Sequence, residues 1–295
     1  AAAPAPAPAP PPPPAPLPPP PAAPPAPPSA ESEALRLFYA RVQANLLRQG
    51  LLRGDGEAAD APFTDTALAR DFVAVALFGE YADRGGVLVP ERQAYALRRW
   101  ERPIRMKVIV GPSVPAAQAA RDRSAVAAFA RRLSRLTGVP VTFTDDDPNF
   151  TVMILSEDER EAGAGLLRAA LPAVSRASER AFLEPARDTY CLALTTWDAT
   201  GGYDRAVALI RAEAPDLIRT ACIHEEMAQA MGLPNDSPTA RPSIFNDNDE
   251  FALLTRHDEL LLRLLYDPRL RTGMTEAEAL PVVRQVAREL VEGGA

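Results

Sequence analysis

The sequence predicts an α+β domain with a mixed sheet, preceded by a pair of helices and a proline-rich tail. Three observations predict this class. First, residues 1–28 are almost entirely Ala and Pro, and 17 of the 32 prolines fall there. Second, from Ser29 onward apolar residues recur at helical spacing. Third, short β-branched runs alternate with amphipathic stretches after Pro103, which is the order of a helix-covered sheet.

The N-terminal segment 1–28 is expected to be a disordered Pro/Ala-rich tether. Proline lacks a backbone donor and alanine buries little surface, so the segment cannot pack and favours extended polyproline II. The alternative is a ligand for a domain that recognises proline-rich segments, but the repeat lacks the flanking basic or aromatic residue that such recognition needs. Because no signal segment is visible at Ala1, export is an expectation drawn from the tether and the cysteines.

Residues 29–100 are expected to form N-terminal helices packed on the main domain. One apolar stripe predicts a first helix that ends at Gly50, and a second stripe predicts a helix over 64–82. We expect this pair to form a helical hairpin. The stripe residues of the first helix are Leu35, Phe38, Val42 and Leu46, and those of the second are Leu68, Phe72, Val75 and Phe78.

The main domain is predicted to span residues 101–295 and to contain the sheet. Runs rich in β-branched residues predict strands, and amphipathic stretches closed by Gly or Pro predict helices. The strand over 206–211 is expected at the edge of the sheet. The predicted strands are 106–110, 141–144, 151–155, 190–196 and 206–211, and the predicted helices are 118–137, 157–170 and 216–231.

Composition and charge exclude some partners. The formal net charge is -7 and the isoelectric point is about 5.1, whereas nucleic-acid phosphates need a concentrated basic face. Charged residues interrupt every apolar run before the roughly 18 residues that a membrane span needs. We therefore expect neither nucleic acid as a partner nor a membrane-spanning segment.

The two cysteines, Cys191 and Cys222, can form one disulfide or remain buried free thiols. An exported protein meets an oxidising environment, so the tether favours the disulfide. A periplasmic or cell-envelope location is the expectation that follows.

The polar residues of the last predicted helix carry the main motif. Residues 222–236 read CIHEEMAQAMGLPND, with a polar residue four positions after Glu225 and a glycine three positions later. This spacing resembles the metzincin pattern H-E-x-x-H-x-x-G-x-x-H when Gly232 takes the glycine position. The general-base position then holds Glu226. The three zinc-ligand positions hold Glu225, Gln229 and Asn235.

The resemblance implies the geometry of a zinc site without its ligands. Residues four apart lie on one helical face, and the glycine lets the chain turn so that a third ligand returns. A frame that starts at His224 puts Ala228 where the second histidine belongs. The chain has only 2 histidines, so a three-histidine site is excluded. Three oxygen ligands would suit calcium or magnesium better than zinc, but we expect no metal and no cofactor.

The segment downstream extends the resemblance. Residues 243–247 read SIFND and stand where metzincins carry a methionine-containing turn, with Phe245 in place of the methionine. The segment 254–266 resembles the closing helix of metzincins. The chain also resembles an uncharacterised bacterial family of envelope lipoproteins, with motifs E-E-x-x-Q-x-x-G-L-x-N-D, S-I-F-N-D and L-Y-D-P-R-L. The resemblance implies a zincin-like (metzincin-type) domain with an active-site-type helix and C-terminal helices.

Several polar residues have structural interpretations beside the functional ones. Asp236 and Asp247 are expected to hold the helix and the following turn by hydrogen bonds. Asn246 begins an oxygen-rich stretch that ends at Glu250, which lacks the glycine and spacing of an EF-hand and is expected to form turns and a helix cap. His257 is interpreted as a cap or surface residue.

We expect a non-catalytic zincin-like envelope protein that binds a peptide or protein partner through the former active-site cleft. One alternative is a zinc-independent hydrolase or lyase that uses Glu225 and Glu226. Adjacent helical residues point about 100° apart, so both carboxylates cannot readily face one bond. Another alternative is a purely structural envelope protein. N-terminal anchoring is left open.

Overall fold

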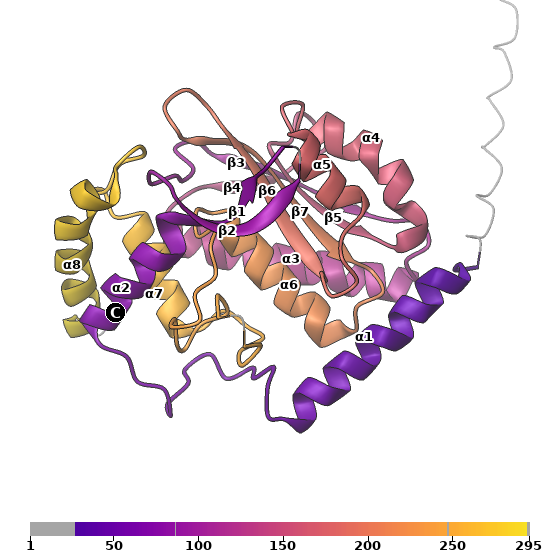
Figure 1. Ribbon diagram of the computed structural model, residues 1–295, viewed down its shortest axis with the longest axis horizontal. Coiled ribbons are helices and arrows are strands. Elements are labelled where there is room, and N and C mark those ends of the chain that lie inside the picture. The colour runs from indigo at the N-terminus through magenta and orange to yellow at the C-terminus, as the bar shows by residue number, and fades with distance from the viewer. Residues whose placement is uncertain (1–26, 86, 247, 294–295) are drawn as a thin grey trace, which may run out of the picture.

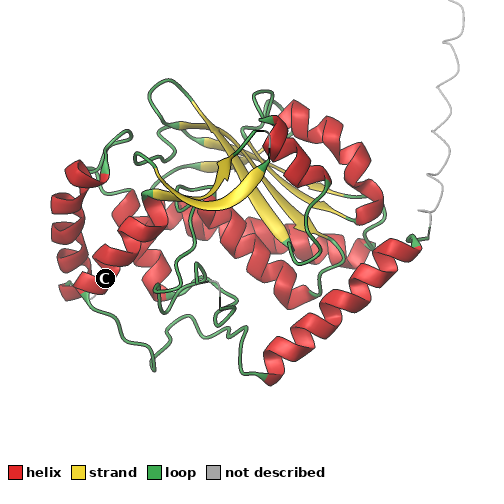
Figure 2. Ribbon diagram, in the orientation of Figure 1, coloured by secondary structure: helices red, strands yellow, loops and turns green. Residues whose placement is uncertain are grey.

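The computed structural model describes residues 27–85, 87–246 and 248–293. The predicted mixed α+β class is confirmed: helices surround a mixed sheet (Figures 1 and 2). The predicted tether lies, up to residue 26, outside the described residues. The helices are α1 Ala30–Arg48, α2 Asp65–Ala76, α3 Ala116–Thr137, η1 Glu157–Glu159 (3-10), α4 Arg160–Ala170, α5 Arg176–Leu183, α6 Asp216–Gln229, α7 Arg256–Leu265 and α8 Glu276–Glu292. The strands are β1 Phe78–Asp83, β2 Leu88–Ala94, β3 Ile104–Val110, β4 Val141–Phe143, β5 Phe150–Leu155, β6 Cys191–Trp197 and β7 Tyr203–Arg211.

The main sheet has the order β4-β3-β5-β7-β6. Strands β4, β3, β5 and β7 are parallel, and β6 pairs antiparallel with β7. The expectation that 206–211 forms the sheet edge is therefore wrong, because β7 lies between β5 and β6. The short turn after Trp197 lets β6 lie directly beside β7, as antiparallel neighbours can. The edge strand on that side is β6.

The two faces of the sheet bury alternate side chains of β5, all of which are inaccessible to solvent. Val152 and Ile154 belong to the large core shared with α3 and α6. Met153 and Leu155 belong to a second cluster with side chains of α4 and α5. This two-sided burial explains why β5 reads as a continuous apolar run rather than an alternating one.

The predicted helical hairpin of α1 and α2 does not form. Helix α2 packs on α7 and α8, and α1 lies at the other end of the molecule (Figure 1). Helix α2 also ends at Ala76, and the last part of the predicted 64–82 helix is strand β1. Gly79 permits this, because a Cβ there would lie 2.2 Å from the ring of Tyr95.

The remaining predicted helices lie close to observed ones, but two helices of the described residues, α5 and α8, were not predicted. Helix α8 has no counterpart among the predicted elements, although Thr275 and Glu278 form a capping box at its start. The β1–β2 hairpin and α5 were likewise unpredicted. Side chains from α1, α2 and α8 share one buried cluster with the rest of the domain. The N-terminal helices are thus packed on the sheet domain.

Candidate functional site

Helix α6 carries the motif and is fixed at two points near its start. A disulfide joins Cys222 on α6 to Cys191 at the beginning of β6, with a Cα–Cα distance of 5.8 Å. The buried guanidinium of Arg219 donates to both carboxylate oxygens of Asp122 on α3, with Nε 3.0 Å from each. Bidentate pairs of this kind are strong and directional. The motif residues therefore extend from a rigid base.

The carboxylates of Glu225 and Glu226 lie beside this disulfide. Ligand atoms of Glu225, Glu226 and Cys191 all fall within 4.8 Å of one another. Glu226 is only 4% exposed, whereas Glu225 is half-buried. Because the sulfur of Cys191 is oxidised, it offers no thiolate. Within the part of the chain that the structure describes, this group therefore offers two carboxylates and an oxidised sulfur, whereas zinc favours thiolate and imidazole ligands.

Asn235, at the third ligand position of the motif, faces helix α2. Its amide nitrogen donates to the carbonyl of Ala74 at 2.8 Å and to the carbonyl of Asp236 at 2.7 Å. Its backbone N–H donates to the carbonyl of Val75 at 3.2 Å. Asn235 therefore attaches the segment after α6 to the C-terminal end of α2.

Gln229 and Asp236 interact with each other on the same segment. The amide of Gln229 donates to Oδ1 of Asp236 at 3.3 Å. Between them, Gly232 has φ 123°, and a Cβ there would lie 2.3 Å from the carbonyl oxygen of Arg98. Only glycine fits this conformation and this approach. The turn after α6 thus has the sharp glycine bend that the motif implies.

Phe245 and Asn246 stabilise the loop that follows. The Phe245 side chain is fully buried, and the amide of Asn246 donates to the carbonyl of Ala240 at 2.7 Å. The Arg241–Pro242 peptide in this loop is cis. Asp247, which the sequence places beside these residues, lies outside the described residues.

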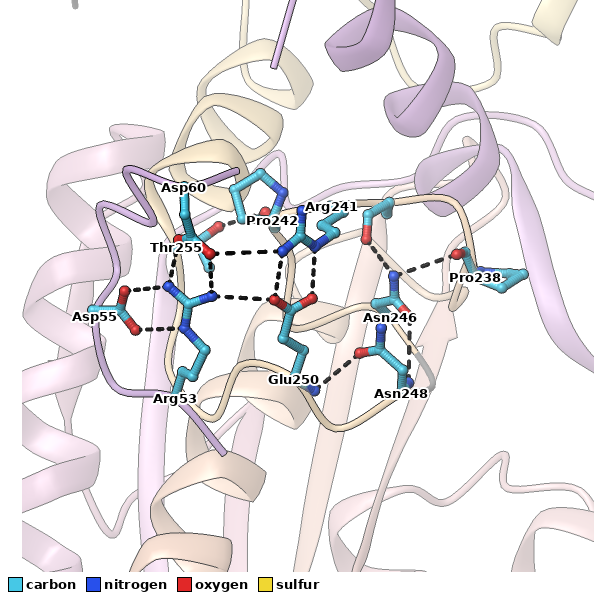
Figure 3. Close-up of polar contacts among 11 residues, drawn as sticks. Arg53, Asp55, Asp60, Pro238, Arg241, Pro242, Asn246, Asn248, Glu250 and Thr255 are labelled. Atoms are coloured by element: carbon cyan, nitrogen blue, oxygen red, sulfur yellow. Dashed lines mark hydrogen bonds and ion pairs between the residues drawn. The ribbon is translucent and has the colours of Figure 1, made fainter. Parts of the chain in front are cut away.

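An ionic network ties this loop to the segment before α2 (Figure 3). Arg53 donates to Asp55 and Asp60 at 2.9 Å each, and also contacts Glu250 at 3.2 Å. Arg241 donates to the other carboxylate oxygen of Glu250 at 2.7 Å, and this hydrogen bond lowers the pKa of Glu250. Glu250, the last residue of the oxygen-rich stretch, is therefore paired with two arginines.

His257 is not the surface residue that the sequence suggested. It is fully buried, because its imidazole lies between α2 and the start of α7. Its Nε2 is 3.3 Å from Oδ2 of Asp71, and its Nδ1 is 3.7 Å from Oδ1 of Asp258. Burial alone would lower the pKa of His257, but the interactions with Asp258 and Asp71 outweigh it, so the pKa is raised. The imidazole thus links two buried carboxylates.

Asp258 is also the hydrogen-bond centre of this region. Its carboxylate accepts from the Ser243 hydroxyl at 2.5 Å, from the Ile244 N–H at 3.1 Å, and from both the N–H and the hydroxyl of Thr255 at 2.9 Å. These bonds combine a capping box at the start of α7 with support of the loop at Phe245.

A groove borders the motif on the side of α2. It has a volume of about 620 Å³, and we call it the α2–α8 groove. The loop after α6 contributes its third wall. The lining residues are Asp65, Thr66, Ala69, Arg70, Val73 and Ala74 of α2, Asn235, Asp236, Ser237, Pro238 and Thr239 of the loop, and Glu276, Leu280, Arg284 and Arg288 of α8.

The groove includes only part of the predicted site. Asn235 and Asp236 line it, whereas Glu225, Glu226 and Gln229 do not. Its α2 and α8 walls were not predicted, because no local pattern indicates that helices some 200 residues apart will pack together. The mixed charges at positions such as Arg70 and Arg284 resemble any solvated helix face in the sequence.

The site and fold define a mixed α+β domain with a disulfide-anchored helix and a helix-lined groove. The chain belongs to the family DUF2927, described as proteins of unknown function, whose profile matches residues 65–285. The match begins at α2 and includes the whole sheet and the motif. No curated protein and no solved structure matches the chain significantly.

Two observations bear on location. The Cys191–Cys222 disulfide is compatible with an extracytoplasmic protein, since such bonds persist in oxidising compartments. Among the described residues, no helix has the length and apolar character required to cross a membrane.

Proposed function

We propose that this chain is a non-catalytic, zincin-like envelope protein that binds an extended segment of a peptide or protein partner in the α2–α8 groove. The residues at the zinc-ligand positions support a non-catalytic role. Asn235 is hydrogen-bonded to Ala74, and Gln229 to Asp236, so both side chains hold the groove wall. These bonds use the amide nitrogens, and they give both side chains a structural role in the wall of the groove.

The zincin-like part of the proposal is supported by the order of elements around the motif. A mixed twisted sheet, the motif helix α6 directly after β7, the bend at Gly232 and the closing helix α7 are the parts that the resemblance implies. They occur here in the implied order, with Phe245 buried in the turn between α6 and α7.

The observation that carries the binding role is the composition of the α2–α8 groove. Ala69, Val73 and Leu280 provide an apolar strip, and charged side chains of both signs flank it. Peptide-binding grooves combine apolar contact with a few polar groups that fix orientation, and an extended chain of mixed charge matches this pattern. The partner is therefore expected to be a peptide segment rather than a compact apolar molecule.

The hydrolase alternative has less support than binding. A catalytic carboxylate must reach the bond that it acts on, which requires a cavity beside it. Glu225 and Glu226 do not line the α2–α8 groove. The purely structural alternative differs from ours in one outcome, because it predicts no ligand for the groove.

A peptide-display selection against the full chain, followed by measured affinities, tests the proposal. Thr66 is exposed in the first turn of α2 and lines the groove, so Thr66→Trp fills the groove without disturbing the core. We expect Thr66→Trp to weaken the selected peptides by at least about tenfold, as loss of a well-packed contact would. The matched control is Ser124→Trp on the exposed face of α3.

Peptides that bind Thr66→Trp as tightly as the unmodified chain would contradict the groove as the binding site. A selection that yields no peptide above background would favour the purely structural alternative. Far-ultraviolet circular dichroism of both variants shows whether they remain folded.

A further inference from the structure

Arg98 belongs to the segment before β3. Its side chain lies over the ring of Trp197, the last residue of the edge strand β6. Its guanidinium carbon lies 3.6 Å from the ring centroid of Trp197 and 4.8 Å from that of Tyr95. Cation–π contacts of this kind hold the planar guanidinium in a fixed orientation. The group is thus positioned before any ligand arrives.

No carboxylate pairs with Arg98 among the residues that the structure describes. Its neighbours differ: Arg99 pairs with Glu101 at 2.9 Å, and Arg102 pairs with Asp198 at 2.5 Å. The backbone on both sides of Arg98 is also held, because the N–H of Leu97 donates to the carbonyl of Met274 at 2.8 Å and the carbonyl of Arg99 accepts from the N–H of Tyr203 at 3.0 Å. Arg98 therefore offers a positioned cation whose hydrogen-bonding edge is not used by an internal anion.

A cavity of about 350 Å³ is lined by both Arg98 and Trp197. Small residues form much of its wall, including Ala199, Gly201 and Gly273, which leaves room near the cation. Trp197 is 48% exposed, which is unusual for so large an apolar side chain. Asp198 also lines the cavity, but its charge is compensated by Arg102, and hydrogen bonds from Thr200 lower its pKa.

We propose that this cavity binds a carboxylate group, with Arg98 as its bidentate partner and Trp197 as the wall that fixes the guanidinium. A guanidinium matches a carboxylate through two parallel N–H···O bonds. A single carboxylate carries one negative charge and fits one unpaired cation. A phosphate carries more charge and would call for further cations, which the lining does not supply. This site is separate from the α2–α8 groove and does not depend on the function proposed for that groove.

Tryptophan fluorescence of the full chain can report binding directly. The chain has 2 tryptophans, and Trp100 is only 2% exposed, so Trp197 provides the solvent-sensitive signal. The probes are a tripeptide with a free C-terminal carboxylate, the same tripeptide amidated, an amidated tripeptide with an internal glutamate, and inorganic phosphate. All titrations are made at one ionic strength, because exposed charge interactions are screened by salt.

We expect a saturable change with a carboxylate probe and none with the uncharged amide. The two carboxylate peptides distinguish a chain terminus from an acidic side chain as the source of the group. Arg98→Lys keeps the charge but loses the planar fork, so it should weaken binding by about tenfold. The control is Arg105→Lys, a residue outside the cavity that pairs with Asp147.

The proposal fails if the amide titrates like the acid, if phosphate binds more tightly than either carboxylate, or if Arg98→Lys binds as the unmodified chain does. Arg98→Gln provides a second variant in case the lysine form does not fold. Trp197→Phe keeps an aromatic wall and should retain carboxylate binding by calorimetry while losing the fluorescence signal.

Discussion

The two histidines of this protein, half-buried His224 and fully buried His257, have opposite surroundings. His224 on α6 stacks on Phe129 with ring centroids 4.1 Å apart, and its Nδ1 accepts the N–H of Leu254 at 3.0 Å. Burial lowers the pKa of His224 to about 4. His257 lies between Asp71 and Asp258, and its pKa is raised. The two environments therefore shift the pKa values of the two imidazoles in opposite directions.

This contrast concerns the role of the histidines, which connect segments of the fold around the motif. In a zinc peptidase histidines would be ligands, whereas here each histidine holds two segments of the core together. His224 fixes α6 to the loop before α7, and His257 fixes α2 to α7. Since α2 forms one wall of the α2–α8 groove, the buried charges support the groove from behind.

Removing a carboxylate beside His257 should give the largest loss in the free energy of unfolding. Asp258→Ala removes four hydrogen bonds and one of the two carboxylates beside His257, so we expect a loss of about 3–5 kcal/mol in the free energy of unfolding. Urea denaturation measures it. Glu278→Ala is the matched control, because Glu278 holds the same capping-box position at the exposed start of α8. Equal losses in the two variants would contradict the special role of the buried site.

The lowered pKa of His224 should make the free energy of unfolding sensitive to acid. Its folded-state pKa lies below the unfolded value of about 6.5, so its contribution is present above that pH and is lost as the pH falls toward 4. The loss attributable to this residue should reach up to about 3 kcal/mol. Urea denaturation between pH 7 and pH 4 measures it, with His224→Gln as the comparison. An unchanged acid profile in that variant would show that His224 does not titrate as described.

The hydrogen bonds that attach Asn235 to α2 should contribute less to the free energy of unfolding than the buried carboxylate of Asp258. Asn235→Ala removes the bonds to Ala74 and Asp236, and we expect a loss of about 1–2 kcal/mol in the free energy of unfolding. The same variant should weaken groove ligands, because the wall is no longer attached. Asn248→Ala, at an exposed position in the ionic loop, is the control. A stable Asn235→Ala variant with full ligand affinity would argue against a supporting role.

The smallest effect is expected from the titration of His257 itself. Its folded-state pKa is above the unfolded value, so its stabilising contribution is present below about pH 6.5 and is lost as the pH rises through the elevated pKa. Burial lowers the pKa of His257, whereas the two carboxylates raise it, so the net contribution to the free energy of unfolding is modest. Unfolding free energies from pH 6 to pH 9 should decline less in His257→Gln than in the unmodified chain. A steeper decline in the variant would reverse the assigned sign.

The sequence predicts local elements well and their arrangement poorly. The apolar run of β5 and the amphipathic pattern of α3 are read from neighbouring residues, and both lie within a few residues of the predicted bounds. The position of β6 at the sheet edge depends on pairing between strands, which local periodicity does not contain.

The same limit applies to the candidate site. The spacing from Glu225 to Asn235 correctly indicates a helix followed by a glycine bend. The partner of Asn235 is a backbone carbonyl on α2, and a carbonyl carries no sequence signature. His257 reads as a surface residue because Asp71, its partner across the core, is 186 residues away in the sequence. Arg98 likewise has no local signal that it will stack on Trp197.

Metal content tests the central claim most directly. The full chain, purified without chelator, is analysed for transition metals, and its cleavage of an unstructured casein-like substrate is assayed with and without chelator. We predict no stoichiometric transition metal and no chelator-sensitive cleavage, since the three zinc-ligand positions of the motif hold Glu225, Gln229 and Asn235 and no histidine. One zinc per chain together with chelator-sensitive cleavage would contradict this account and assign Glu226 as the general base.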